Sequence, residues 1–209
     1  KYIILRRSIN SACGKRRLFS GAPQIAAGGS AVKFMIASDL HGSAFYARKL
    51  AEIFRAEGAD VLVLLGDIYN HGPRNPLPEE YAPLKVAEVL NGLADRLLVI
   101  KGNCDSDVDT LISEFEFVSE AVLVSGGRRV FLQHGDRFSV DSLPKNCGDG
   151  FFYGHYHTSF LRREGKVLVA NPGSVSLPKQ GTARGYLLLE DGAVTLKDLD
   201  GAVLAEETL

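Results

Sequence analysis

The sequence predicts one α/β domain in which parallel strands in the first half are followed by a mostly antiparallel second half. Between residues 34 and 100, short apolar runs alternate with amphipathic stretches, which is typical of βαβ units. From residue 121 onward, apolar runs are joined by glycine-containing turns, which are typical of β-hairpins. A chain of 209 residues with 45% hydrophobic residues can bury a sizeable core in a single domain.

The first half contains the predicted parallel strands. Phe34–Ile36 and Val61–Leu65 are apolar throughout, and a helix is expected between them from about Ala44 to Ala56. A second helix near Pro83–Arg96 leads to a third buried strand, Leu97–Ile100. This order favours parallel neighbours in one sheet.

The second half carries the hairpin signals. Outside the first 31 residues there is no internal repeat and no low-complexity block, so we expect one domain over residues 32–209. The tight turns are expected at Ser125–Gly127, Glu164–Gly165, Asp191–Gly192 and Asp200–Gly201.

Residues 1–31 differ in composition from the rest of the chain. They contain six basic residues and no acidic one, so they carry a charge of +6, which leaves −7 for the remainder of a chain with a net charge of −1. We interpret them as a basic N-terminal extension that is disordered or not part of the native protein, for example sequence translated upstream of a start at Val32. An organellar transit peptide is a less favoured alternative.

Composition argues against several classes of protein. A charge of −1 provides no overall polyanion-binding surface, so nucleic acid is not expected as an obligate partner. No apolar run approaches the ~20 residues of a membrane span. The three cysteines, Cys13, Cys104 and Cys147, are too scattered for a disulfide framework, which indicates a reducing compartment and, by default, the cytoplasm. Whether the chain forms a homo-oligomer is left open.

Five short polar signatures each follow or close an apolar run, and they contain four of the chain's five histidines. Carboxylates, imidazoles and an amide are the ligand types that a two-metal hydrolytic centre requires. The signatures are Asp39-Leu40-His41, Gly66-Asp67, Gly102-Asn103, His134-Gly135 and Gly154-His155-Tyr156-His157.

Each acidic or amide residue alone has an ordinary structural explanation. Asp39 is of a type favoured at helix N-caps, and Asp67 and Asn103 are common turn residues after glycine. His41 changes the balance, because the alternation of an extended chain would place its side chain on the same side as that of Asp39. Asp67 ends the neighbouring strand, so the two carboxylates should converge.

The histidines carry the sharpest signal. His155 and His157 follow the buried run Phe151–Tyr153, and Gly154 between them and the run permits close backbone approach. His134 likewise ends an apolar run, although a single buried histidine is more often a core residue than a ligand. Seven such residues at five strand ends make coincidence a weak explanation.

The order of the signatures resembles that of the calcineurin-like metallophosphoesterases over roughly residues 33–209. Residues 65–75 (LGDIYNHGPRN), 102–105 (GNCD) and 171–179 (NPGSVSLPK) also resemble the small bacterial YfcE-type phosphodiesterases. The resemblance implies a four-layer α/β/β/α sandwich. It further implies that one metal ion is bound by Asp39, His41 and His157, that a second is bound by Asn103, His134 and His155, and that Asp67 bridges both.

The implied reaction is hydrolysis of a small phosphodiester. Two divalent ions ~3.5–4 Å apart hold a water between them, lower its pKa and present hydroxide for in-line attack on phosphorus. Nitrogen and oxygen ligands without thiolate favour Mn²⁺, with Fe²⁺, Zn²⁺, Ni²⁺ and Co²⁺ as alternatives. A phosphomonoesterase on the same site and a non-enzymatic binding module of the same fold are the rival interpretations.

The source of the leaving-group proton is not settled by the resemblance. Many calcineurin-like members have a histidine where this chain has Cys104, although the YfcE-type proteins share the cysteine. The loop of residues 70–80 begins three residues after Asp67 and should lie over the metals. Within it His71 could supply the proton and Arg74 could bind phosphate, and the ordinary alternatives are a loop hydrogen bond and a surface charge.

Overall fold

The structure is a computed structural model that describes residues 5–8 and 31–209. The predicted parallel strands are present, and β2 pairs with β3 and β3 with β4 in parallel register. Helix α1 connects the first two strands and helix α2 the second and third. The bounds are β2 (Phe34–Ala37), α1 (Ala44–Ala56), β3 (Val61–Leu64), α2 (Pro83–Asn91) and β4 (Leu97–Ile100).

The two helices begin and end for local reasons. The Ser43 side chain accepts the backbone N–H of Tyr46 at 3.2 Å and caps α1. Helix α2 is shorter than predicted, because it ends at Asn91 with Gly92 as the C-cap residue. Glycine is a poor helix former, and the chain continues as a separate 3₁₀ helix, η1 (Ala94–Arg96).

The second half consists of β-strands joined largely by the predicted turns. β5 and β6, β8 and β9, β10 and β11, and β11 and β12 are antiparallel pairs. A 3₁₀ helix, η2 (Asp107–Leu111), precedes them. The bounds are β5 (Phe117–Ser125), β6 (Arg128–Leu132), β7 (Gly150–Phe152), β8 (Ser159–Glu164), β9 (Val167–Pro172), β10 (Gly185–Glu190), β11 (Ala193–Asp198) and β12 (Val203–Thr208).

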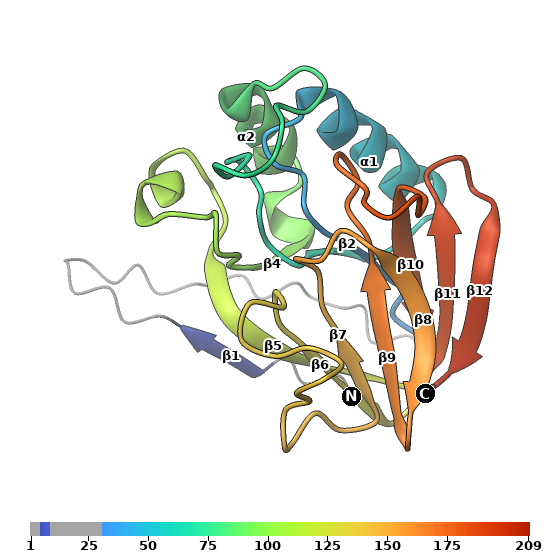
Figure 1. Cartoon of the computed structure of the whole chain (residues 1–209). Coiled ribbons are helices and arrows are strands. Elements are labelled where there is room, and N and C mark those ends of the chain that lie inside the picture. The colour runs from blue at the N-terminus through green and yellow to red at the C-terminus, as the bar shows by residue number, and fades with distance from the viewer. Residues whose placement is uncertain (1–4, 9–30) are drawn as a thin grey trace.

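Two pairings in this half depart from the antiparallel expectation. β6 pairs with β7 and β7 pairs with β9, both in parallel. Residues 133–149 between β6 and β7 are long enough to return the chain to the same end of the sheet, as parallel pairing requires. The strands follow one hydrogen-bonded order, β12-β11-β10-β2-β3-β4-β5-β6-β7-β9-β8, and Figure 1 shows how this sheet curves around.

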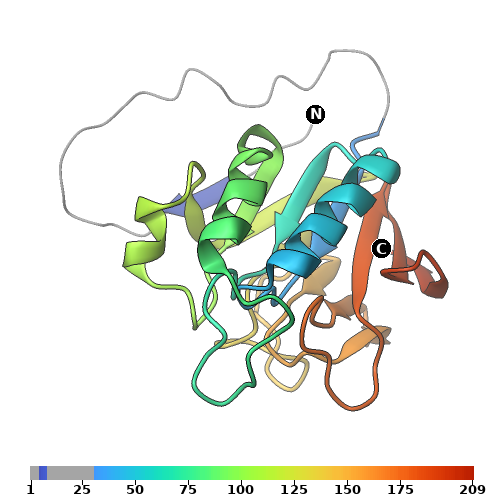
Figure 2. The ribbon, with the colours of Figure 1, turned by 90° about the horizontal axis from the view of Figure 1, so that it is seen from above.

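Alternate residues of each strand face two different cores. Phe34 and Ile36 of β2 pack in one cluster with Val130 and Leu132 of β6, so the two halves of the sheet lie face to face. Met35, from the other face of β2, belongs to the cluster that the two helices cover. Figure 2 shows α1 and α2 next to each other over this outer face.

The opposite outer face is covered differently. Phe151 and Val169 there pack against Phe138, Val140 and Leu143, which belong to the connection between β6 and β7. This connection contains no helix, so the fourth layer of the predicted sandwich is an irregular segment in this chain.

One strand lies within the predicted N-terminal extension. β1 (Leu5–Ser8) pairs antiparallel with β5, with Arg6 opposite Ala121. Residues 1–4 and 9–30 lie outside the described residues. The division of the chain at residue 31 therefore stays a prediction.

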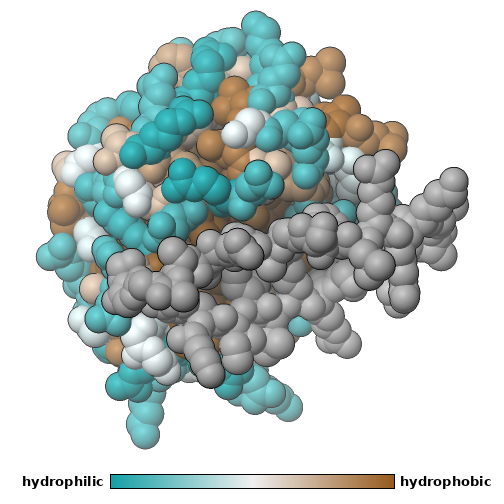
Figure 3. Space-filling view, turned by 180° about the vertical axis from the view of Figure 1, so that it is seen from behind, coloured by the Kyte–Doolittle hydropathy of each residue, from teal (hydrophilic) through white to brown (hydrophobic). Residues whose placement is uncertain are grey.

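Neither α1 nor α2 is long and apolar enough to cross a bilayer, and the same holds for every helix in the described residues. On the face seen from behind, hydrophilic side chains are spread over much of the surface that the grey atoms leave visible (Figure 3).

Candidate metal centre

The five polar signatures follow the carboxyl ends of β2, β3, β4, β6 and β7. β2, β3 and β4 run parallel, so their carboxyl ends share one edge, and the parallel strands β6 and β7 share another. Side-chain contacts such as His41 with His157 and Asn103 with His134 show that the two edges meet. Figure 2 shows the loops that follow them gathered on the same side of the molecule.

One group of side chains consists of Asp39, His41 and His157, and all three are buried. The Nε2 atoms of His41 and His157 lie 2.9 Å apart. Asp39 Oδ1 lies 3.6 Å from His41 Nε2 and 3.3 Å from His157 Nε2. This buried oxygen has no hydrogen-bond partner in the described part of the chain.

A second group consists of Asp67, His134 and His155, with Asn103 beside it. His134 Nε2 lies 3.4 Å from Asp67 Oδ1, 3.0 Å from Asn103 Oδ1 and 3.2 Å from His155 Nδ1. Asp67 also faces the first group, since its Oδ2 lies 3.7 Å from His41 Nε2. Asp67 therefore lies between the two groups.

The hydrogen bonds of the histidines fix which ring nitrogen carries the proton. A backbone carbonyl oxygen can only accept, so a ring nitrogen beside it must donate, and the neutral ring then has a lone pair at the other nitrogen. Three rings are held in this way through Nδ1 at 2.6–2.7 Å: His41 by the carbonyl of Asn70, His134 by Leu65 and His157 by Leu177.

The consequence is that lone pairs converge without a donor between them. The Nε2 lone pairs of His41 and His157 face each other, and that of His134 faces the Asn103 oxygen. Only a proton or a metal ion makes such contacts attractive, and a carbonyl behind the ring is the usual support of a metal-binding histidine. The donor set thus fits divalent cations on both sides of Asp67.

The carboxylates give the site the charge that a cation needs. Although burial opposes its ionisation, the adjacent His157 and His41 imidazoles lower the pKa of Asp39. Burial likewise opposes the charge of His134, yet Asp67 and Asp39 raise its pKa to about 9. Without metal, His134 is therefore protonated at neutral pH, at the position where a cation would bind.

The backbone at the site is strained. Five of the seven predicted ligands have the left-handed φ that non-glycine residues rarely adopt. This corrects the expectation for Asp39 and His41, which meet at the site because both backbones turn there and not because the chain between them is extended. The φ values are 59° for Asp39, 50° for His41, 56° for Asp67, 68° for His155 and 60° for His157.

A buried carboxylate that was not predicted as a site residue holds part of this backbone. Asp105 accepts the backbone N–H groups of Asp67 at 2.8 Å, Ile68 at 2.7 Å and Gly102 at 2.7 Å. Burial and the Asp67 carboxylate raise its pKa to about 6, so it is still ionised at neutral pH. It thereby ties the turn after β3 to the turn after β4.

Other polar residues, at the end of β9 and in the loop between β9 and β10, support the first group. The Ser174 and Ser176 hydroxyls donate to the Asp39 carbonyl oxygen at 2.7 Å and 3.0 Å. Asn171 donates to the Gly154 carbonyl oxygen at 2.7 Å. The sequence offered only the resemblance of residues 171–179 as a signal for this role.

Glycines next to the ligands allow segments to approach closely. A Cβ atom at Gly154 would lie 1.9 Å from Ser38 Oγ, and one at Gly102 would lie 2.2 Å from Asp67 Oδ1. The close backbone approach predicted at Gly154 is therefore confirmed. These positions exclude any larger residue without movement of the site.

The loop of residues 70–80 lies against the site, as expected. A Cβ atom at Gly72 would lie 2.9 Å from Cys104 Sγ, and Cys104 is close to both Asp67 and His41. Burial and the Asp67 carboxylate raise the pKa of Cys104 to about 12, so it is a thiol at neutral pH. His71 packs edge-on against Tyr81 and has a buried Nδ1 atom without a partner in the described residues. Arg74 is exposed, and the structure does not bring it to the two groups.

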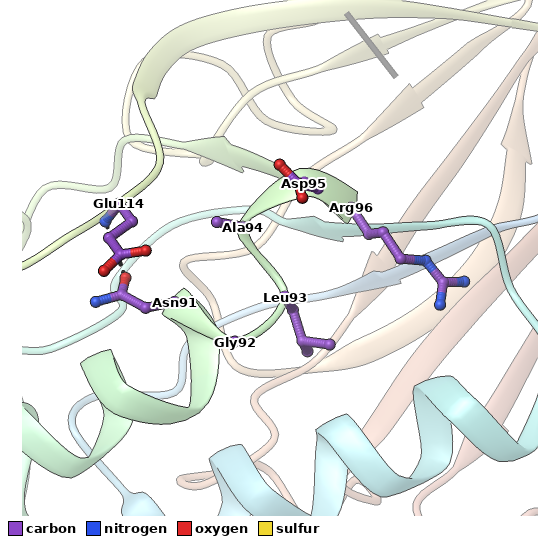
Figure 4. A pocket seen from close by; sticks show the side chains of 7 residues that line it. All are labelled: Asn91, Gly92, Leu93, Ala94, Asp95, Arg96 and Glu114. Carbon is purple, nitrogen blue, oxygen red and sulfur yellow. Dashed lines mark hydrogen bonds between the residues drawn. The ribbon is translucent and has the colours of Figure 1, made fainter. Parts of the chain in front are cut away.

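A separate surface pocket of about 320 Å³ lies at the end of α2 and contains none of the predicted site residues (Figure 4). Two of its polar side chains, Asn91 and Arg96, are already engaged. Asn91 donates to the Ile112 carbonyl oxygen and accepts the Glu114 N–H. The Arg96 guanidinium donates to the Asp60 carbonyl oxygen and lies over the Phe54 ring. These residues supply structure and not chemistry.

Comparison with known proteins connects this geometry to a family. The model of the calcineurin-like phosphoesterase superfamily domain matches residues 32–192. Phosphodiesterase YfcE of Escherichia coli K12 is 42% identical over 179 residues, which are 84% of this chain and 97% of that protein. The probable metallophosphoesterase YsnB of Bacillus subtilis 168 is 29% identical over 181 residues, which are 80% of this chain and 90% of that protein.

A solved structure agrees with this assignment. The structure of the phosphoesterase YfcE from E. coli superposes with a TM-score of 0.81 at 39% identity, over 85% of this chain and 99% of that chain. The comparisons confirm the fold class that the sequence predicted.

Proposed function

Because the chain belongs to the calcineurin-like phosphoesterase superfamily, we propose that it hydrolyses a small phosphodiester with two divalent metal ions held on either side of Asp67. That the chain is a metal-dependent phosphoesterase follows from the family and from its similarity to the E. coli phosphodiesterase. The number of ions, their identity and the manner of attack are our proposal.

The convergence of lone pairs at the two groups carries this proposal. Asp39, His41 and His157 would hold one ion, and Asn103, His134 and His155 would hold the other. The ligands are neutral nitrogen donors, carboxylates and an amide, and Cys104 is a thiol. This ligand set favours Mn²⁺ over softer metal ions, although Fe²⁺, Zn²⁺, Ni²⁺ and Co²⁺ fit the same ligands. When bound, two such cations lower the pKa of water for in-line attack on phosphorus and offset charge on the phosphoryl oxygens.

The chain's own residues prepare the site for this chemistry. The carbonyl oxygens behind His41, His134 and His157 keep each Nε2 atom aimed inward and free of a proton once a cation is bound. Asp105 fixes the backbone that presents Asp67. His71 is proposed to protonate the leaving oxygen, and Arg74 to bind a phosphate oxygen when the loop of residues 70–80 approaches substrate.

The two rival interpretations are a phosphomonoesterase and a binding module without activity. A phosphomonoesterase would use the same ligands, but Cys104 stands where an acidic partner for poor leaving groups is needed, which favours diesters with good leaving groups. A binding module without activity would not need six further ligand-type residues arranged around the Asp67 carboxylate.

The decisive experiment replaces Asp67 with Asn. Asp67 faces both groups, so the variant should lose both ions. Its rate of hydrolysis should fall by more than the ~10–100-fold that loss of a supporting residue costs. Metal content per chain and hydrolysis of methyl 4-nitrophenyl phosphate are measured, with 4-nitrophenyl phosphate as the monoester. The exposed Asp95→Asn is the matched control and should change neither. Two ions per chain in an active Asp67→Asn protein would contradict the proposal.

A further inference from the structure

Tyr156 is an exposed aromatic residue between two residues of the metal centre. Its relative exposure is 49%, whereas His157 beside it is buried. Its backbone N–H donates to the Gly154 carbonyl oxygen at 2.7 Å, and the Thr158 hydroxyl donates to the Tyr156 carbonyl oxygen at 3.3 Å. The backbone of this residue is therefore held on both sides.

The ring of Tyr156 is also held in place. It packs edge-on against the His155 ring, with centroids 5.3 Å apart and an interplanar angle of 87°. It packs in the same manner against Tyr153, at 5.9 Å and 84°. Tyr153 is buried and its hydroxyl accepts the Val140 N–H at 3.3 Å, so it is a firm support. A rigid aromatic ring thus stands beside a predicted ligand with about half of its surface in solvent.

This ring borders the side from which substrate reaches the centre. The first group of Asp39, His41 and His157 is buried. In the second group Asn103 is exposed and His155 is only half-buried, so the centre opens to solvent there. Because Tyr156 contacts His155 directly, it lies at this opening.

The charge at the same rim favours an uncharged group over a second phosphate. Asp136 is one of the carboxylates that act electrostatically on His155. Asp136 is exposed and is hydrogen-bonded by Gln133, so a fixed negative charge lies near this side of His155. A polyphosphate chain would be repelled here, whereas an aromatic substituent would find a ring to stack on.

We propose that the Tyr156 ring stacks on an aromatic substituent that stays on phosphorus when the leaving group departs, so that the preferred substrates carry an aryl group at that position. This inference rests on the proposed function, because the metal centre is to bind the diester phosphate. Tyr156 acts as a specificity-determining residue and takes no part in the chemical step.

The activity test uses two diesters with the same leaving group. Methyl 4-nitrophenyl phosphate and phenyl 4-nitrophenyl phosphate differ only in the substituent that stays on phosphorus. Tyr156→Ala should raise KM for the phenyl ester about two- to tenfold relative to the methyl ester, and Tyr156→Phe should leave the ratio unchanged. An equal loss on both esters with Tyr156→Ala would overturn the proposal.

A binding test keeps the two proposals separable. Dimethyl phosphate and diphenyl phosphate are titrated into full-length, Mn²⁺-loaded protein by calorimetry, and metal content is measured for each variant. The wild-type chain and Tyr156→Phe should prefer diphenyl phosphate, and Tyr156→Ala should lose that preference. If wild type hydrolyses neither ester, the proposed function fails, while this preference alone still supports the role of Tyr156. Equal affinity of the wild-type chain for dimethyl phosphate and diphenyl phosphate would overturn the proposed role of Tyr156.

Discussion

Asp105 accepts the backbone N–H of Asp67 at 2.8 Å, so one buried carboxylate holds the backbone that presents another. The same side chain accepts N–H groups from Ile68 and Gly102, with both of its oxygens in use. Left-handed backbone at Asp67 costs free energy, and such strain persists only where surrounding contacts determine the conformation. We infer that Asp105 supplies this determination for the turns after β3 and β4.

Asp105→Asn should therefore weaken metal binding as well as the fold. In either orientation the new NH₂ group meets a backbone N–H, which should cost about 1–3 kcal/mol of unfolding free energy. Metal affinity should fall by about 10–100-fold, as for other residues that support ligands. Urea denaturation and metal titration measure the two effects.

A surface aspartate in the same loop provides the control. Asp109 accepts the Ser106 N–H at 2.7 Å in an exposed cap. Asp109→Asn should cost about 1 kcal/mol of stability and leave metal affinity unchanged. Unchanged metal affinity in Asp105→Asn would show that Asp105 serves the fold alone.

The second prediction concerns pH. His134 must be neutral to bind a cation, but in the metal-free protein Asp67 and Asp39 raise its pKa to about 9 against the effect of burial. Metal binding should therefore release protons at pH 7, and metal affinity should rise until about pH 9. Calorimetry of Mn²⁺ binding in buffers of different ionisation enthalpy measures the protons released.

The stability of the metal-free protein should change in the opposite direction. A histidine whose folded pKa lies above the unfolded value of ~6.5 contributes stability that is complete below that pH and is lost as pH rises through the folded pKa. Thermal unfolding with chelator should thus show falling stability up to about pH 9, whereas Mn²⁺-loaded protein should not. Activity should fail in acid through loss of metal, and excess Mn²⁺ should move that acid limb lower. An acid limb that ignores metal concentration would contradict this.

The third prediction concerns residues 1–31. Deleting them removes β1 from β5, but the described core residues and every predicted ligand lie beyond position 31. We expect the truncated chain to bind metal and hydrolyse diester as the full chain does, with a small change in melting temperature. A large fall in melting temperature or turnover would show that the segment belongs to the domain.

Local patterns in the sequence predicted the elements well and the long-range pairing less well. The apolar runs of β2, β3 and β4 and the glycine turns between the later strands are local signals, and the structure contains these elements. The parallel pairing of β7 with β6 and β9 depends on where a 17-residue connection returns, spanning positions 133–149, which no local pattern specifies.

The same distinction applies to the site. Strand-end logic predicted that Asp39 and Asp67 would converge, because the carboxyl ends of parallel strands share an edge, whereas the grouping of all seven residues came from the family resemblance. It did not predict the left-handed backbone at Asp39 and His41. The Asp39 carbonyl oxygen is held by Ser174 and Ser176, which lie more than 130 positions away in the sequence. Nor did it single out Asp105, whose three N–H partners come together only in the fold.

The last prediction concerns the proton for the leaving group. His71 has a buried Nδ1 atom without a hydrogen-bond partner in the described residues, on a loop that contacts Cys104. Cys104 is a poor acid at neutral pH, because burial and Asp67 raise its pKa to about 12. We therefore expect His71→Gln to lower kcat by about 10²–10⁴-fold on diesters with a poor leaving group such as methanol, while both ions stay bound.

The dependence on the leaving group separates an acid from a residue that only shapes the loop. 4-Nitrophenolate needs little protonation, so His71→Gln should slow 4-nitrophenyl esters far less than alkyl esters, and Cys104→Ser should affect both classes weakly. If His71→Gln slows good and poor leaving groups equally with full metal content, His71 positions the loop of residues 70–80, and the proton comes from solvent.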